Sequence, residues 1–160
     1  MTSPSVYPLA MDHVSLDDME NHPRVADVQK HVTDPLNLAD MALNYYELEP
    51  GDSFSGGLHT HMNQEEVFLV IEGTATFQTK DDAVEVGANE IARFAPGEYQ
   101  EGRNDGDERV RAVAMGAPQE AGETRTAMPC QECGAEYHIA EVTADGVELT
   151  CPECGNVLEM

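Results

Sequence analysis

Short apolar runs, separated by turn residues, dominate the chain between residues 41 and 115. The clearest run is 74–79, where Ala75 and Phe77 alternate with polar residues at the two-residue period of a half-buried strand. The other strands expected on this basis are 41–48, 66–71, 83–86, 90–94 and 109–115. Turn signals such as Pro50-Gly51 and Pro96-Gly97 lie between them. Many short strands at a spacing of roughly ten residues predict an all-β sandwich or barrel.

The composition changes along the chain and suggests four regions. Residues 1–40 read as an N-terminal arm with the first short strands, and 41–116 as the barrel core. Residues 117–127 are small and polar and include Pro and Gly, which is typical of a linker. The remaining unit, 128–160, is too short to fold on hydrophobic burial alone, so it needs a metal ion or disulfides.

The segment 57–66 contains the first candidate for chemistry. His59 and His61 are two residues apart, so on a strand their imidazoles project from one face. A short turn and a new strand would bring Glu66 alongside them. Two imidazoles and one carboxylate suit Fe(II), Mn(II), Ni(II) or Zn(II) and leave positions open for water or substrate. The alternative is a pair of surface histidines in a loop.

This stretch resembles the first motif of the cupin superfamily, in which His-x-His is followed by a Glu and then by a Gly. Here those positions are His59, His61, Glu66 and Gly73. One small departure is Ser53, which stands where cupins normally have a glycine.

The second cupin motif is matched by Gly87, Pro96-Gly97 and Asn104. Gln100 stands where that motif has its metal-binding histidine. Glutamine can ligate through its amide oxygen, more weakly than imidazole and as a harder donor. The resemblance, which spans residues 41–115, therefore implies a metal site of His59, His61, Glu66 and Gln100.

The same resemblance implies an antiparallel barrel of the jelly-roll type and a homodimer. The cupin fold hosts oxygenases, isomerases, decarboxylases and plain binding proteins, so the fold does not define a reaction. We expect a divalent transition metal and a small polar metabolite in the barrel. If the protein is an enzyme, a metal-dependent oxygenase or isomerase fits this site. The alternative is a non-enzymatic module that senses a ligand or a metal.

Other residues near the motif are weaker candidates. Glu65 is the rival of Glu66, and we expect it to point toward solvent. Arg93 could bind an anion but is more simply a solvent-facing residue of its strand. One of Tyr45 and Tyr46 is expected to point inward. Core packing is expected for Phe68, Phe77, Phe94 and Met115, and exposure to solvent for His13, His22, His31 and His138.

The four cysteines form two C-x2-C pairs separated by seventeen residues. They are Cys130, Cys133, Cys151 and Cys154. Four thiolates so arranged give a tetrahedral site suited to structural Zn(II). Two strands, 137–142 and 147–150, flank the hairpin signal Asp145-Gly146, which completes the layout of a zinc ribbon. Disulfides are the alternative.

The cysteine unit also resembles rubredoxin, on the same cysteines together with Gly134, Tyr137, Pro152 and Gly155. That resemblance implies an iron site, and a further hypothesis is electron delivery to an iron cupin. The loop is shorter than in rubredoxin and the aromatic core is missing, which favours zinc. A protein partner that docks on the ribbon is the remaining hypothesis for this unit.

The net charge of −23 is dispersed along the chain rather than collected in a block. Such a surface stays hydrated at high salt, where a Debye length of about 3 Å screens its self-repulsion. The composition resembles that of halophilic haloarchaeal proteins, although a merely acidic mesophilic protein is the alternative. Nucleic acid is disfavoured as a partner. No secretory signal or membrane-length apolar run is evident, so we expect a cytoplasmic protein, whose reduced thiols favour metal over disulfides.

Overall fold

The computed structural model describes residues 11–160, so the first ten residues of the expected N-terminal arm lie outside the described part. The all-β prediction is confirmed: apart from one 3-10 turn, η1 (Leu16–Asp18), the elements are thirteen strands among the described residues. That turn is far too short to cross a membrane, and among these residues there is no long apolar helix that could do so.

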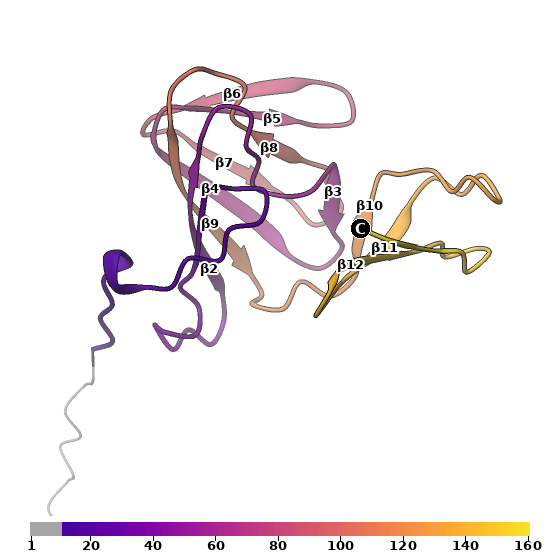
Figure 1. Ribbon diagram of the computed structural model, residues 1–160, viewed down its shortest axis with the longest axis horizontal. Coiled ribbons are helices and arrows are strands. Elements are labelled where there is room, and N and C mark those ends of the chain that lie inside the picture. Colours follow the sequence, from indigo (N-terminus) through magenta and orange to yellow (C-terminus); the bar gives the residue numbers. More distant parts are fainter. Residues whose placement is uncertain (1–10) are drawn as a thin grey trace, which may run out of the picture.

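The larger sheet of the barrel has five antiparallel strands in the order β1-β2-β9-β4-β7. These strands are β1 (Val28–His31), β2 (Ala42–Leu48), β9 (Val110–Ala117), β4 (Glu65–Glu72) and β7 (Ile91–Phe94). Alternate residues of β9 are buried, because successive side chains of a strand point to opposite faces. The inward face of this sheet therefore covers the barrel interior (Figure 1).

The opposing sheet is smaller and has the order β6-β5-β8. Its strands are β5 (Thr74–Gln78), β6 (Ala83–Gly87) and β8 (Glu101–Arg103). Strand β3 (His59–His61) extends it through one bridge, in which His59 and Gln100 exchange backbone hydrogen bonds of 3.2 and 2.9 Å. The two cupin motifs therefore meet at the edge of this sheet.

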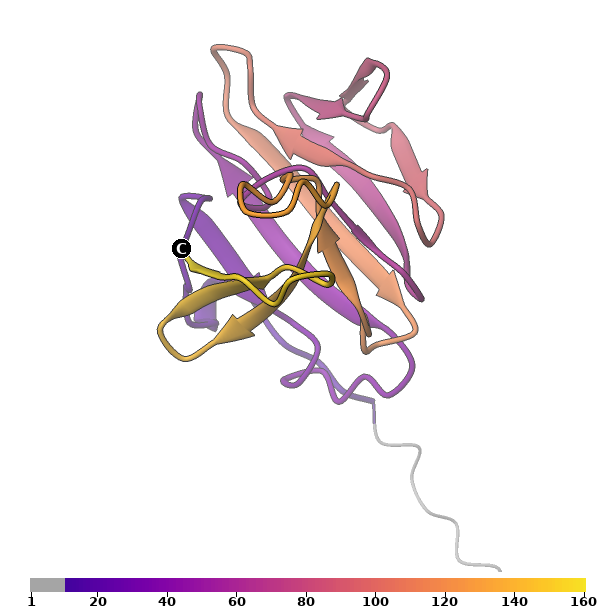
Figure 2. The ribbon, with the colours of Figure 1, turned by 90° about the vertical axis from the view of Figure 1, so that its right-hand side faces the viewer.

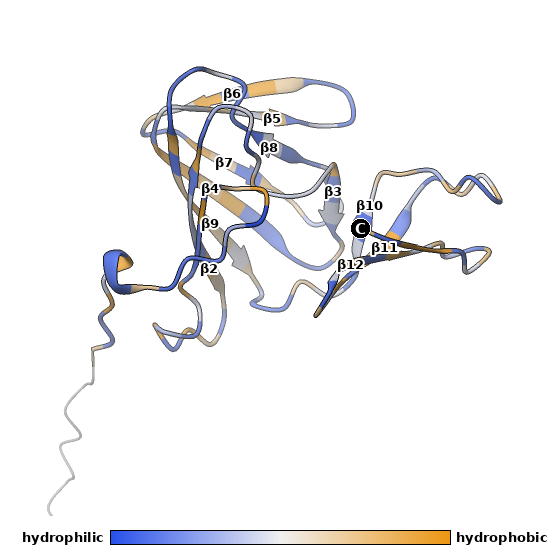
Figure 3. Ribbon diagram, viewed as in Figure 1, coloured by the Kyte–Doolittle hydropathy of each residue, from blue (hydrophilic) through white to orange (hydrophobic). Residues whose placement is uncertain are grey.

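The core lies between the two sheets and is built on aromatic rings. Phe54 lies 5.7 Å from Phe77 and 5.2 Å from Phe68, measured between ring centroids, and all three side chains are buried. Gly102 is required beside them, because a Cβ there would lie 2.5 Å from both Phe54 and Phe77. Apolar residues are concentrated on the barrel strands, whereas the connecting loops are mostly polar (Figure 3).

The turn from β4 to β5 depends on a second glycine. Gly73 has a φ of +77°, and a Cβ there would lie 2.4 Å from the backbone oxygen of Arg109. L side chains rarely adopt this conformation, so glycine fits the position best. The glycine of the first motif thus lets the chain pass through a tight turn from β4, which carries Glu66, into β5 of the opposing sheet.

The C-terminal unit forms the third sheet, in the order β13-β12-β11-β10-β3. Its strands are β10 (Thr124–Thr126), β11 (His138–Thr143), β12 (Gly146–Thr150) and β13 (Val157–Glu159). Strand β10 lies within the segment 117–127 that the sequence predicts as a linker, and it pairs with both β3 and β11. The sheet of the cysteine unit is therefore continuous with the barrel strand that carries the histidine pair (Figures 1 and 2).

Candidate metal sites

The predicted histidine pair and its carboxylate come together inside the barrel. His59 and His61 project from one face of β3 with ring centroids 5.1 Å apart. Glu66, on β4, places its Oε1 atom 3.5 Å from Nε2 of His61. One potential ligand atom from each of the three residues lies within 4.8 Å of the others. This spacing is suited to a single ion.

Hydrogen bonds to the Nδ1 atoms orient both imidazoles. Nδ1 of His59 lies 2.8 Å from the carbonyl oxygen of Gly57, so Nδ1 carries the hydrogen and donates it. Nδ1 of His61 lies 2.9 Å from the hydroxyl of Thr124, on β10. With each Nδ1 engaged in this way, the Nε2 atoms are the ones left for a ligand. Partners of this kind fix the tautomer and the ring orientation of metal-binding histidines.

Gln100 completes the group from the second motif. Its side chain is 3% exposed, and Nε2 donates a 2.7 Å hydrogen bond to Oε2 of Glu66. Because a carboxylate only accepts, this bond fixes the amide orientation. Oε1 is then a buried acceptor without a hydrogen-bond partner among residues 11–160. Leaving such an atom unsatisfied costs about 1–3 kcal/mol, and a bound cation would remove that cost.

The protonation states match those of metal ligands. Burial lowers the pKa of His59 and favours the neutral imidazole. Burial on its own raises the pKa of Glu66, but the neighbouring imidazoles of His61 and His59 and the hydrogen bond from the Gln100 amide outweigh it. The net effect is a lowered pKa for Glu66, so the carboxylate is ionised at neutral pH. A neutral histidine and an ionised carboxylate are the forms that bind a metal.

The four residues line a cavity of about 300 Å³. Polar uncharged side chains form much of its remaining wall, namely Asn44, Ser55, Gln64 and Gln119. Tyr46 also lines it, and burial raises the pKa of this phenol to about 12, so the hydroxyl stays protonated. The cavity therefore offers hydrogen-bonding groups without a positive charge of its own.

The rival residues lie elsewhere, as the sequence predicted. Glu65 points outward and accepts a 2.7 Å hydrogen bond from Nε of Arg93, and both side chains are about half exposed. Of the tyrosine pair, Tyr46 faces the cavity, whereas the hydroxyl of Tyr45 lies 2.7 Å from Glu47. Phe68 and Phe77 are core residues.

Several residues of the site carry no local sequence signal. Gln64 reaches the segment after β9, where its Nε2 donates to the carbonyl oxygen of Pro118 at 2.8 Å. Gln119 and Thr124 belong to the expected linker, and Thr124 is 63 residues from its partner His61. The polar composition of this segment indicates a position outside the core, and no pattern in it predicts a contact with the metal site.

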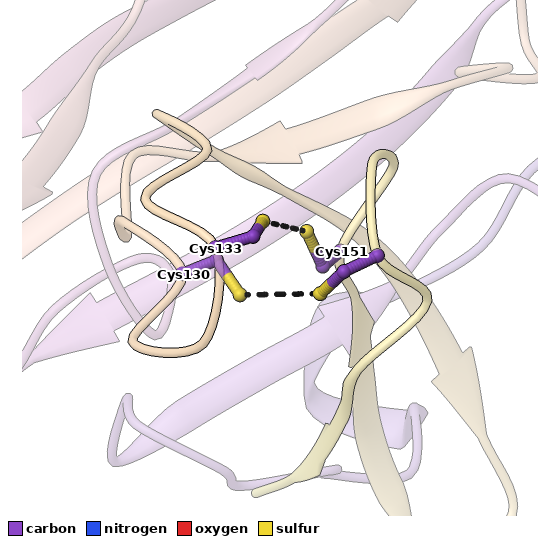
Figure 4. A group of neighbouring side chains, drawn as sticks. Cys130, Cys133 and Cys151 are labelled. Carbon is purple, nitrogen blue, oxygen red and sulfur yellow. Dashed lines mark hydrogen bonds between the residues drawn. The ribbon is translucent and has the colours of Figure 1, made fainter.

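The four cysteines form a second cluster, in the C-terminal unit (Figure 4). Their Sγ atoms lie 3.7 Å apart between Cys130 and Cys154 and 3.5 Å apart between Cys133 and Cys151. All four thiols are free. Tetrahedral Zn–S bonds of about 2.3 Å place neighbouring sulfurs about 3.8 Å apart, whereas a disulfide needs about 2.05 Å. The spacing fits a four-thiolate metal site.

The backbone of the second knuckle stabilises a thiolate. The N–H groups of Cys154 and Glu153 donate to Cys151 and lower its pKa to about 6. Backbone N–H groups that donate to Cys154 and Cys133 also lower their pKa values, but burial and hydrogen bonds between the sulfurs outweigh this effect, so both pKa values are raised. Cys151 is therefore the thiol held as a thiolate, the form that binds a metal.

The prediction that His138 lies in solvent is wrong. Its side chain is 0% exposed, and Nδ1 lies 2.7 Å from the carbonyl oxygen of Met128. His138 is the first residue of β11, and its Cα pairs with that of Thr126 on β10. Sequence reasoning missed this because the pairing joins β11 to a segment with no strand-like pattern.

Comparison with known proteins agrees with this geometry. Residues 44–116 match the family model described as a cupin domain. A search of curated proteins gave no significant match.

Solved structures that share this fold include these three. A sugar phosphate isomerase from a cupin superfamily, from Silicibacter pomeroyi, is 19% identical with a TM-score of 0.69, covering 91% of this chain and 96% of that one. The polyketide cyclase RemF from Streptomyces resistomycificus is 21% identical with a TM-score of 0.63, covering 77% and 89%. An uncharacterized protein with a double-stranded β-helix domain from Klebsiella pneumoniae is 23% identical with a TM-score of 0.57, covering 69% and 92%. At these identities the likeness establishes the fold alone.

Proposed function

Because residues 44–116 match the family model of a cupin domain, we propose that this protein is a metal-dependent cupin. Its barrel holds one divalent transition-metal ion on His59, His61, Glu66 and Gln100, and its cavity takes a small, uncharged polar metabolite. The four cysteines hold a separate ion, for which zinc is the preferred candidate.

The observation that carries the proposal is the unsatisfied Oε1 atom of Gln100. Its amide is fixed by the 2.7 Å bond to Glu66, which is itself grouped with both histidines. Two imidazole nitrogens, one carboxylate and one amide oxygen form a donor set that suits Fe, Mn, Ni or Zn. A cation bound there would neutralise Glu66 and satisfy the amide oxygen at once.

The cavity wall supports an uncharged ligand. Neither Arg nor Lys is among the residues that line it in the described chain, and the protein carries a net charge of −23. A sugar phosphate requires a cationic side chain for its phosphate group, and this wall offers no Arg or Lys for that purpose. A hydroxyl or carbonyl compound can instead use the amides of the wall and the protonated phenol of Tyr46.

The chain's own residues prepare the site in three ways. Glu66 stays ionised, the Gln100 amide holds it in place, and burial keeps His59 neutral. Tyr46 can donate a hydrogen bond to an oxygen of the ligand. The bound metal would supply Lewis-acid polarisation of such an oxygen.

Elemental analysis of protein purified in high salt tests the proposal. We expect two metal ions per chain in the wild type and one in the His59→Ala/His61→Ala variant, with the cysteine-bound ion retained. The Glu65→Gln variant is the matched control and should keep both ions. A wild-type protein with a single ion would show that the barrel is a metal-free binding module.

A further inference from the structure

Strand β10 connects the cysteine unit to the barrel site through backbone pairing. Thr124 pairs with His61, Arg125 with Thr60 and Thr126 with His59. Two more backbone bonds extend the ladder, from Ala127 N to Leu58 O and from Met62 N to Glu123 O, both 2.9 Å long. On its other side, β3 has one bridge, from His59 to Gln100, and one further backbone bond, from Gly97 N to His61 O at 3.0 Å. The continuous backbone pairing of β3 is therefore with the segment that leads into the cysteine unit.

One side chain of β10 reaches a proposed metal ligand directly. The hydroxyl of Thr124 lies 2.9 Å from Nδ1 of His61. A threonine hydroxyl can accept the Nδ1 hydrogen, which leaves Nε2 of His61 with the lone pair that a metal needs. His61 has no other side-chain or backbone partner on Nδ1 among residues 11–160.

The other side of β10 is fixed by the cysteine unit. Thr126 pairs with His138, whose Nδ1 lies 2.7 Å from the carbonyl oxygen of Met128, just before the first knuckle. The guanidinium of Arg125 lies 4.4 Å from the ring centroid of Tyr137. The position of β10 therefore depends on β11 and on the first knuckle.

The cysteine unit has little core of its own. Its buried apolar cluster consists of Cys130, Ala135 and Cys151. A unit of this size gains most of its folding free energy from metal coordination. Loss of the cysteine-bound ion would therefore release β11 and, with it, the support of β10.

We infer that the cysteine unit is a structural part of the barrel metal site, with Thr124 as the positioning residue that connects them. This inference rests on the proposed metal site in the barrel. The ion held by the four cysteines keeps β10 on β3, and Thr124 then holds His61 in the tautomer and orientation that bind the barrel ion. Occupancy of the cysteine site thereby controls the affinity of the barrel site.

Titration of the full-length protein with Mn(II), with zinc retained in the cysteine site, measures the barrel alone. Mn(II) prefers carboxylate and carbonyl oxygens, whereas thiolates prefer zinc. Removing a hydrogen-bond partner of a metal-binding histidine typically costs 10–100-fold in metal affinity. We expect Thr124→Val to weaken Mn(II) binding at least about 10-fold and Thr124→Ser to restore it, with unchanged zinc content in both.

Thr126→Val is the matched control, because Thr126 lies on the same strand and pairs with His59 through its backbone. It should bind Mn(II) as the wild type does. If Thr124→Val binds Mn(II) as tightly as the wild type, the role of Thr124 is refuted. Absence of a Mn(II) site in the wild type would instead refute the proposed function, so the two failures are distinguishable.

A second variant tests the coupling between the two sites. Cys133→Ser/Cys154→Ser removes the exposed thiol of each knuckle, and we expect it to lose zinc and to bind Mn(II) about 10-fold or more weakly. Loss of zinc with unchanged Mn(II) affinity would overturn the coupling. Circular dichroism of the same variant should show an unchanged strand content of the barrel, which separates a loss of affinity from unfolding.

Discussion

Replacing Gln100 by glutamate should reverse the pH dependence of the barrel's stability. In the wild type, Nε2 of Gln100 donates to Oε2 of Glu66 at 2.7 Å, and the pKa of Glu66 is lowered from 4.5. A folded-state pKa below the unfolded value gives stability that is present above pH 4.5 and is lost as the pH falls through the folded pKa. In Gln100→Glu two carboxylates face each other, so the pair retains one proton and its upper apparent pKa rises. Stability should then fall as the pH increases from 4.5 toward that raised pKa.

The expected size follows from the contact that is replaced. A hydrogen bond to a charged group contributes about 1.5–3 kcal/mol. Two unit charges 4 Å apart repel by about 4 kcal/mol at an effective dielectric constant of 20, and the retained proton relieves part of this. We therefore expect a loss of about 2–4 kcal/mol at pH 7 in the absence of a barrel ion. For a domain of about 100 residues this lowers the Tm by roughly 10 °C or more.

Thermal unfolding between pH 4 and pH 8 measures the effect. The protein should be in 2 M KCl with zinc retained in the cysteine site, because high salt screens the exposed charges but affects a buried pair much less. Gln78→Glu is the control, since it adds the same charge at an exposed residue of β5. It loses two exposed hydrogen bonds, to the backbone oxygens of Thr79 and Asp82, and should change stability by no more than about 1 kcal/mol.

Addition of Mn(II) provides the second readout. An ion between the two carboxylates would remove their repulsion, so Mn(II) should raise the Tm of Gln100→Glu more than that of the wild type. Parallel pH curves for wild type and variant would refute the contact between Gln100 and Glu66. An equal response to Mn(II) would refute an ion between them.

Three further predictions concern the site and the core. Glu66→Gln should abolish Mn(II) binding in a calorimetric titration, whereas Glu65→Gln should leave it unchanged and cost less than about 1 kcal/mol, the usual limit for an exposed ion pair. Gly102→Ala should destabilise the barrel by about 1–3 kcal/mol in urea unfolding, because its Cβ would overlap two core phenylalanine rings, whereas Gly56→Ala, with nothing within 4 Å of the added Cβ, should be nearly neutral. The pKa of His59 is lowered from 6.5 in the folded protein, so on acidification the unfolded chain binds this proton at a higher pH than the folded protein does. Stability should therefore fall as the pH decreases below 6.5. A His59→Asn variant that keeps the full wild-type dependence of stability on pH in acid would contradict this.

The barrel could be predicted from sequence because its strands obey a local rule. The expected strands 41–48, 74–79 and 109–115 correspond to β2, β5 and β9 within one or two residues at each end. Each is at least five residues long and alternates or forms a continuous apolar run, so its pattern can be recognised from the sequence alone. The prediction of an all-β cupin fold with a small cysteine unit is confirmed.

The proposed ligands were also recognisable, but for a different reason. His59, His61 and Glu66 lie within eight residues of one another, so the turn between β3 and β4 alone brings them together. Gln100 could be identified only by its place in a known motif. Its hydrogen bond to Glu66 and its unsatisfied oxygen are seen only in the folded structure.

The contacts made through β10 could not be predicted from the sequence. This strand has three residues, too few to show a period, and it lies in a small, polar segment with Pro and Gly that favours a loop. Its pairing with β3 spans more than sixty residues. The burial of His138 follows from the same pairing and was missed together with it.

The continuity of the third sheet bears on why a cysteine unit follows this barrel at all. Strand β3 has three residues, and two of them are proposed ligands. A strand this short needs neighbours on both sides to hold its register, and on one side it has only the bridge to Gln100 and the backbone bond from Gly97 N to His61 O within the described chain. A unit tethered by a flexible segment would leave the other edge of β3 exposed to water and its imidazoles free to rotate. Pairing with β10 instead places a chain segment fixed by metal coordination against that edge, which is why we expect barrel affinity, and not only the stability of the cysteine unit, to respond when zinc is removed.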